Sequence, residues 1–405
     1  MKSYRFWFAL FCLIVLPAPR VFAQNDAPIT GVDVAYQFGE QFTIEGLVDP
    51  AADLESVDIQ IAFPGDPRIL SVPIRPGPDG FFRFTHLVSD RFVRAFSNVG
   101  YEFVLTETGG RVDTLGPFSF FYTDNRFEWQ ALGSGSVNVH WYAGDAAYAR
   151  RILDAAVDGL DRSQAILEND ALPTVEIYAY ASLADYQFAR GQLGQLWSGG
   201  HTDPSTGIVL VSLPPGPEVQ IEIERKIPHE VAHVNLFQAT GAGFWNLPVW
   251  LNEGFASILE TTPNPDYEFL VSTRVESGES IPLADLCAGF PRDASGALLA
   301  YAESASVTRF IEETYGPAGL RFLVDSYAAG ASCEQGPLVD PLGLDLTGLD
   351  SAWRDQVPRE AGGGQALQGP DLSALAPMLV ILAAVVLGPG LVLIGSGLRR
   401  GRSGG

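Results

Sequence analysis

Two histidines and a glutamate lie within one five-residue stretch, His229-Glu230-Val231-Ala232-His233. On a helix, residues four apart lie on the same face, so the imidazoles of His229 and His233 can bind one metal ion together. Glu230 lies beside them, where its carboxylate can reach a water molecule on that ion. In this motif the histidines hold zinc and the glutamate is the general base. The stretch therefore predicts a metal site that activates water.

Two helices must bring this chemistry together. Pro228 can occupy the first turn of a helix over about 228–239. Alternatively, the helix begins near Glu218 and kinks at Pro228, and either start leaves both histidines on one face. Pro248 opens a second helix, on which Glu253 faces the first. We therefore expect the site to lie between two consecutive helices.

A second motif, Leu251-Asn252-Glu253-Gly254-Phe255-Ala256, follows the first, with 19 residues between His233 and Glu253. Together the two motifs resemble those of the gluzincin zinc peptidases, in particular the peptidase MA-like group. The second motif is also similar to that of the aminopeptidase N-type enzymes. The resemblance implies that His229, His233 and Glu253 ligate one zinc ion, and that Glu230 is the general base.

The same resemblance implies two further roles. Glu260 matches an acid that orients a metal-ligating histidine by contacting the ring nitrogen that does not bind the metal. The alternative is a solvated surface acid. Tyr301 matches a tyrosine that hydrogen-bonds the oxyanion of the tetrahedral intermediate; a tyrosine packed in a helical core is the alternative. His201 and His140 are weaker candidates for that role. The Gly-x-Met-Glu-Asn segment with which aminopeptidases hold a free N-terminus is absent, so the resemblance does not extend to aminopeptidase activity.

The resemblance implies that residues 127–358 form an α+β, thermolysin-like peptidase domain. The expected strands are 137–142, 175–180 and 207–213, and the expected further helices are 145–167, a helix from 183, 298–315, 320–328 and 338–353. Peptidases of this type bind an extended substrate along a sheet edge just before the metal helix. Strand 207–213 is the candidate for that edge, and an ordinary core strand is the alternative.

Residues 24–126 alternate apolar and polar positions in short runs that turn residues interrupt. The best strand candidates are 41–48, 57–63, 81–87, 101–106 and 118–122. About seven short strands in about 100 residues predict an all-β, immunoglobulin-like sandwich. We expect this domain to be a spacer or a recognition module with a protein or glycan partner.

Both ends of the chain carry apolar segments. Residues 1–23 have a basic start, a short apolar run and a small residue at the exit, which predicts a cleaved signal peptide; an uncleaved anchor is the alternative. After a linker over 359–371, residues 372–398 are uncharged and long enough to form one transmembrane helix. The basic tail 399–405 then places the C-terminus in the cytoplasm and the peptidase domain outside it.

Charge and cysteine content agree with that compartment. The net charge of −23 disfavours nucleic-acid partners. Once Cys12 leaves with the signal peptide, Cys287 and Cys333 remain, and an oxidising compartment favours a disulfide between them. Two buried thiols are the alternative.

The sequence thus predicts an extracytoplasmic, membrane-anchored zinc metallopeptidase that acts on peptide or protein substrates. Zinc would lower the pKa of a bound water, and Glu230 would accept the water's proton and deliver it to the leaving amine. The main rival is a zinc-binding but catalytically inactive surface module whose β-sandwich binds a partner.

Overall fold

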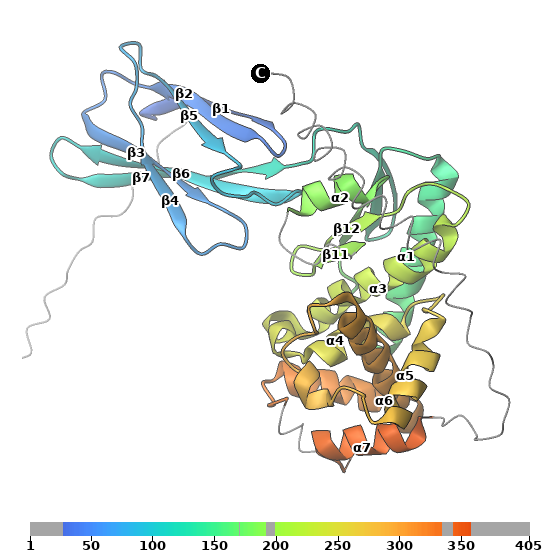
Figure 1. Cartoon of the computed structure of the whole chain (residues 1–405). Helices are drawn as coiled ribbons and strands as arrows, with labels where there is room; N and C mark the ends of the chain where they lie inside the picture. Colours follow the sequence, from blue (N-terminus) through green and yellow to red (C-terminus); the bar gives the residue numbers. More distant parts are fainter. Residues whose placement is uncertain (1–26, 170, 192–198, 334–342, 358–405) are drawn as a thin grey trace, which may run out of the picture. The chain divides into compact units, whose positions relative to one another are not determined.

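The computed structural model describes residues 27–169, 171–191, 199–333 and 343–357 (Figure 1). These residues belong to one compact unit that ends at Val357. The expected signal peptide, the linker 359–371, the transmembrane helix 372–398 and the basic tail lie outside the described residues. Within the described part of the chain, no helix combines the length and the apolar character that a membrane crossing needs.

The N-terminal part is built from two antiparallel sheets (Figure 1). One sheet has the order β1 (Ile29–Gln37), β2 (Gln41–Val48) and β5 (Phe81–Leu87), and the other has the order β4 (Ile69–Pro73), β3 (Leu54–Ala62), β6 (Ser97–Glu107) and β7 (Val112–Tyr122). The inner faces share one core, in which the ring centroid of Phe82 lies 5.7 Å from that of Phe103. The architecture is the expected β-sandwich.

A third sheet, which follows the sandwich in the sequence, is mixed. Its strands are β8 (Gln130–Ser134), β9 (Val137–Trp141), β10 (Val175–Tyr180), β11 (Gly200–Asp203) and β12 (Ile208–Ser212), in the order β11-β12-β10-β9-β8. Strands β9, β10 and β12 are parallel to one another, whereas β8 and β11 run antiparallel to their neighbours. Because β12 has a partner on both sides, the expectation that 207–213 forms the sheet edge is wrong. On this side of the sheet the edge strand is β11, which the turn before Gly207 folds back onto β12.

Two long helices pack against this sheet, α1 (Ala146–Leu167) and α3 (Val219–Thr240), and the short α2 (Leu183–Arg190) follows β10. The carboxylate of Asp145 caps α1 by accepting the N–H of Tyr148 at 2.8 Å. A Cβ at Gly159 would lie only 2.8 Å from Cα of Pro228, so the glycine lets α1 and α3 approach closely. Pro228 lies inside α3, so the longer of the two expected helices is the one that forms.

The remaining elements are helical. They are η1 (Gly241–Asn246), α4 (Val249–Ile258), α5 (Asp266–Ser277), η2 (Leu283–Leu286), α6 (Ala294–Ala328) and α7 (Leu346–Gln356), where η denotes a 3₁₀ helix. Gly316 interrupts α6 with φ of 71°, at the place where the sequence predicts one helix to end and the next to begin. These helices share a core around Trp250, Phe255 and Trp353. Helix α7 begins later than the expected residue 338, and residues 334–342 lie outside the described part.

The sandwich core continues into the mixed sheet. It includes Tyr178 and Tyr180 from β10, and the ring of Phe96 stacks on that of Tyr178 with centroids 3.4 Å apart. The hydroxyl of Tyr180 donates to the fully buried Asp124 at 3.0 Å, and Arg126 pairs with the same carboxylate at 2.7 Å. The boundary between residues 126 and 127 stays a prediction, because a buried polar network crosses it.

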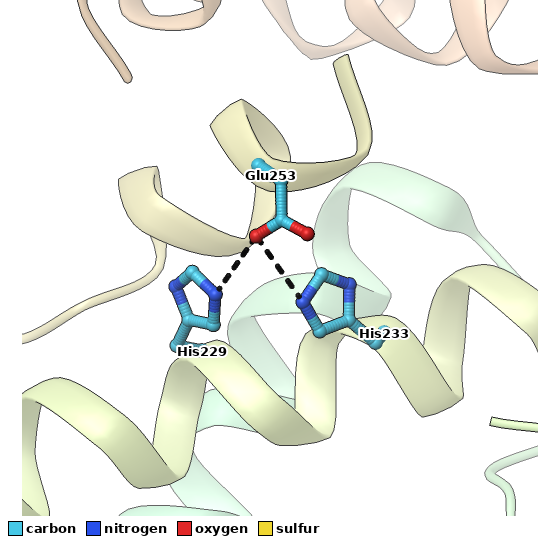
Figure 2. Close-up of side chains that lie close together, drawn as sticks. All are labelled: His229, His233 and Glu253. Atoms are coloured by element: carbon cyan, nitrogen blue, oxygen red, sulfur yellow. Dashed lines mark ion pairs between the residues drawn. The ribbon is translucent and has the colours of Figure 1, made fainter. Parts of the chain in front are cut away.

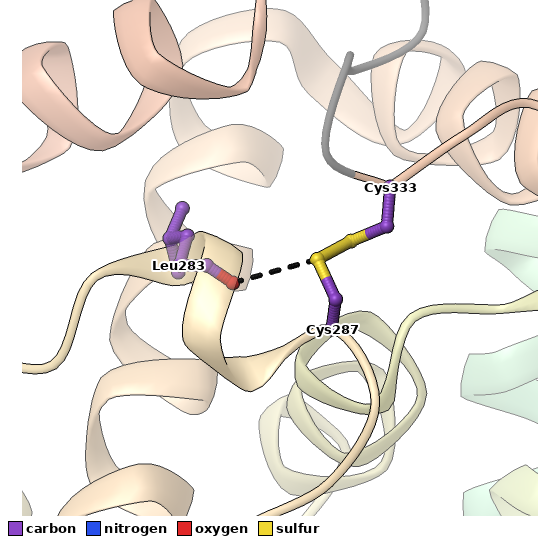
Figure 3. The surroundings of a disulfide bond; sticks show 3 residues. All are labelled: Leu283, Cys287 and Cys333. Carbon is purple, nitrogen blue, oxygen red and sulfur yellow. Dashed lines mark hydrogen bonds between the residues drawn. A yellow bond between two sulfur atoms is a disulfide. The ribbon is translucent and has the colours of Figure 1, made fainter.

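A disulfide joins Cys287, which directly follows η2, to Cys333 (Figure 3). The carbonyl of Cys287 accepts the N–H of Val249, the first residue of α4, at 3.0 Å. The cross-linked segment therefore holds the N-terminus of the helix that carries Glu253.

Candidate metal centre

Helices α3 and α4 bring three donor side chains to one point (Figure 2). The Nε2 atoms of His229 and His233 lie 3.3 Å and 3.8 Å from Oε2 of Glu253. The donor atoms of all three residues lie within 4.8 Å of one another, and the side chains are largely buried. The structure thus brings together the three residues that the sequence analysis assigns to a metal.

The other nitrogen of each ring is also held. Nδ1 of His229 lies 3.1 Å from Oε1 of Glu260, and Nδ1 of His233 lies 3.1 Å from Oδ1 of Asn252. Because both acceptors take an N–H from Nδ1, Nε2 is the nitrogen of each ring that is left to bind a metal ion. Glu260 lies just after the end of α4 and is nearly buried, so it is not the solvated acid of the alternative.

The electrostatics fit a divalent cation. Burial would lower the pKa of His229, but hydrogen bonds and charge from Glu253 and Glu260 outweigh burial and raise that pKa well above its usual range. Burial raises the pKa of Glu253, yet the two histidines more than offset that effect and the pKa is lowered. The buried carboxylates thus stabilise positive charge between them. Two imidazole nitrogens and one carboxylate oxygen are a donor set that suits zinc.

Glu230 lies beside these donors and is 8% exposed. The hydroxyl of Thr202, on β11, donates to its Oε2 at 2.5 Å. A Cβ at Gly200 would lie only 2.1 Å from its Oε1, so the carboxylate packs directly against the backbone of β11. The edge strand therefore fixes the carboxylate in place.

Tyr301 on α6 lines the same cavity, with its ring centroid 6.3 Å from that of His229. Its hydroxyl hydrogen-bonds Glu253, and burial raises the pKa of Tyr301, so the hydroxyl keeps its proton. His201 lines the cavity as well. His140 instead lies on β9, where its Nε2 is 2.7 Å from Glu176.

Gly254 explains how α6 packs so close to α4. A Cβ at this position would lie 2.4 Å from the carbonyl oxygen of Ser304 and 2.2 Å from Oγ1 of Thr308. The glycine after Glu253 therefore lets α4 and α6 pack closely. Because Tyr301 lies on α6, this packing places its side chain at the site. The cavity that results has a volume of about 380 Å³.

Two contacts were not predicted from the sequence. The first is the contact of Asn252 with His233. Asn252 is part of the second motif and directly precedes Glu253, so the sequence did contain a signal for it. Thr202 had no such signal, because its contact with Glu230 depends on how β11 lies over α3.

The family model of the peptidase MA superfamily matches residues 155–359, about half of the chain. The match begins within α1, contains the whole site and extends past α7. The chain belongs to the peptidase MA superfamily. Membership supports a peptidase-type function for the site, in a superfamily whose members typically depend on zinc.

The similarity to solved structures is weak. An aminopeptidase N family protein from Idiomarina loihiensis is 11% identical, with 78% of this chain and 68% of that chain covered and a TM-score of 0.32. A purple acid phosphatase from yellow lupin (Lupinus luteus) seeds is 9% identical, with 40% and 32% covered and a TM-score of 0.20. A polysaccharide deacetylase from Bacillus cereus is 12% identical, with 40% and 56% covered and a TM-score of 0.20. The chain thus spans about a third of the phosphatase and about half of the deacetylase. The comparison with curated proteins found no match. The family assignment rests on the family model.

Proposed function

We propose that the chain is a zinc metallopeptidase that hydrolyses peptide bonds with Glu230 as general base. The observation that carries the proposal is the convergence of His229, His233 and Glu253 on one point, with Glu230 in the same cavity. The donor set leaves room for water and a substrate carbonyl. A general base in place beside the donors favours hydrolysis over an inactive zinc-binding module.

The ion would supply Lewis acidity, which lowers the pKa of water and polarises a scissile carbonyl. Glu230 accepts the proton of the attacking water and passes it to the leaving amine, a role for which Thr202 keeps its carboxylate oriented. Tyr301 has a protonated hydroxyl at the site, and this donor stabilises the oxyanion of the tetrahedral intermediate. Glu260 and Asn252 hold the histidine rings throughout.

The substrate path follows from the sheet. Strand β11 is the outer strand beside the site, and its residues Gly200 and Thr202 lie against Glu230. An extended peptide that pairs with β11 therefore passes its carbonyl groups over the base. We therefore propose β11 as the substrate-binding strand, in place of the candidate strand 207–213, which is the core strand of the alternative.

Cellular location is part of the proposal. The sequence of residues 1–23 supports secretion, and that of 372–398 supports a membrane anchor. A cross-link between Cys287 and Cys333 suits an oxidising compartment outside the cytoplasm. We therefore expect the peptidase site to act outside the cytoplasm, close to the membrane.

The test is cleavage of an unbiased peptide library by the full chain. We expect cleavage when the chain is loaded with zinc, loss of cleavage when a chelator removes it, and recovery when zinc is restored. A chain that binds zinc but cleaves no member of the library would be the inactive module instead.

A further inference from the structure

A second, larger cavity of about 660 Å³ adjoins the metal centre. The two cavities share Arg94, Arg190, His201, Asp203 and Trp245 as lining residues. Arg94 belongs to the sandwich, Arg190 ends α2 and Asp203 ends β11. The sandwich therefore supplies one wall of a space that is continuous with the candidate active site.

The charge of this space differs from that of the chain. The described residues that line the larger cavity include two arginines and one acid, Asp203, whereas the whole chain has a net charge of −23. Burial lowers the pKa of His201 and the charge of Glu230 opposes that shift, while both guanidinium groups lie near enough to lower the pKa further. The positive charge is therefore gathered in one place beside the edge strand.

Arg94 already holds a carboxylate. Its Nη1 lies 3.0 Å from Oδ2 of Asp203, and its side chain is 41% exposed. A Cβ at Gly65 would lie 2.1 Å from Nη2, so the absence of a side chain at residue 65 makes room for the guanidinium. A guanidinium has five N–H donors, and a single carboxylate does not use all of them.

Apolar and aromatic groups surround the two arginines. Phe96, Phe121 and Leu210 line the larger cavity, and Trp245, which is 67% exposed, lines both cavities. Such a lining accepts peptide side chains next to a charged group. Exposed aromatic residues beside a cationic group are typical of a recognition surface.

We propose that the β-sandwich takes part in substrate recognition, with Arg94 and Arg190 binding a carboxylate of the peptide that lies along β11. This inference rests on the proposed function, and it assigns the larger cavity as a subsite for that carboxylate. The carboxylate is either an acidic side chain or the C-terminus of the substrate.

The position of the subsite follows from β11. Gly200 and Thr202 lie against Glu230, and Asp203, at the end of the same strand, contacts Arg94. A paired peptide advances about 3.3 Å per residue, so the carboxylate falls about two to four residues from the scissile bond.

The experiment measures binding to the zinc-loaded full chain with Glu230→Gln, which removes the base. The probes are fluorescent alanine–leucine peptides blocked at both ends, and versions with one glutamate at successive positions. A further arm carries a free C-terminal carboxylate. We expect one of these carboxylates to tighten binding by about tenfold, the effect of one charge-assisted hydrogen bond. The arm that shows the gain identifies the source of the carboxylate.

Three variants in the same background locate the effect. Arg94→Gln and Arg190→Gln should each reduce the gain, and Asp203→Asn, which removes the competing carboxylate, should increase it. The matched control is Arg111→Gln, because Arg111 is also a sandwich arginine paired with an aspartate at 3.0 Å, but it does not line either cavity. This control should keep the full gain.

A gain that survives in Arg94→Gln, or no gain from any carboxylate, would overturn the proposal. The binding assay also separates it from the proposed function. If the library stays uncut while Arg94-dependent binding is present, the peptidase assignment fails and the recognition site stands. If the library is cut and no carboxylate improves binding, the recognition site fails alone.

Discussion

The carboxylate of Glu260 holds the ring of His229 on the side away from Glu253, with Oε1 3.1 Å from Nδ1. Glu260 lies just beyond the end of α4. The helix that carries the donor Glu253 therefore also leads to the residue that orients the donor His229. The relationship fixes both the tautomer and the direction of the imidazole. It makes the site depend on a residue that would not itself touch a metal.

Replacing Glu260 should therefore weaken zinc binding. We expect Glu260→Ala to lower zinc affinity by about 10–100-fold, as is typical when the partner of a ligating histidine is removed. Glu260→Gln keeps an acceptor and should lose less. Competition titration with a chromogenic chelator measures both, with the exposed Glu268→Gln as control. Equal affinity in Glu260→Ala and the unaltered chain would contradict this role.

Gly254→Ala should disturb the contact between α4 and α6. The added methyl would meet the backbone of Ser304, so the helices must separate at a cost of about 1–3 kcal/mol in the free energy of unfolding. Chemical denaturation measures the loss. Gly289→Ala is the control, since a Cβ there has nothing within 4 Å. Equal losses in the two variants would show that Gly254 has no special packing role.

Removing the cross-link should lower stability. The double variant Cys287→Ser with Cys333→Ser should lose about 2–4 kcal/mol in the free energy of unfolding, because its unfolded chain is less restricted. Thermal unfolding of the variant and of the unaltered chain, each with and without reductant, gives the comparison. Reductant should affect only the unaltered chain. If neither the double substitution nor the reductant changes the unfolding midpoint, the disulfide contributes nothing to stability.

Glu303 should make stability depend on pH. It is fully buried in α6, and both its oxygens accept the N–H of Ile281 at 3.1 Å. Burial raises its pKa from 4.5 to about 8. The folded state therefore keeps a proton that the unfolded state releases. This contribution to stability is complete below pH 4.5 and is lost as the pH rises through about 8, by about 1.4 kcal/mol per unit.

Glu303→Gln should remove that dependence while it keeps an oxygen for Ile281. Denaturation at pH 5 and at pH 8 measures it, with the exposed Glu313→Gln on the same helix as control. The control should follow the unaltered chain. Parallel losses of stability in all three proteins would rule out Glu303 as the cause.

Much of the candidate site could be predicted because its chemistry is local in sequence. The four-residue spacing of His229 and His233 puts them on one face of any helix, and the second motif supplies Glu253. The contact between Thr202 and Glu230 could not be predicted, because it depends on tertiary packing between β11 and α3.

The fold shows the same division. The buried, alternating strands of the sandwich were predicted, but β1 and β4 were not among the strand candidates. Both are edge strands with few fully buried side chains, so their pattern is weak. The four-residue β11 and the five-residue β8, which are the two edge strands of the mixed sheet, were missed as well. Short strands owe their structure to their neighbours more than to their own sequence.

The most direct test of the account compares the full chain with its Glu230→Gln variant for zinc content and peptide hydrolysis. We predict one zinc ion per chain in both proteins, because Glu230 is not a donor at the metal site. Hydrolysis should fall by about 10²–10⁴-fold in the variant, the usual effect of losing a general base. Hydrolysis at an unchanged rate in Glu230→Gln, or an unaltered chain that binds no zinc, would contradict the central claim.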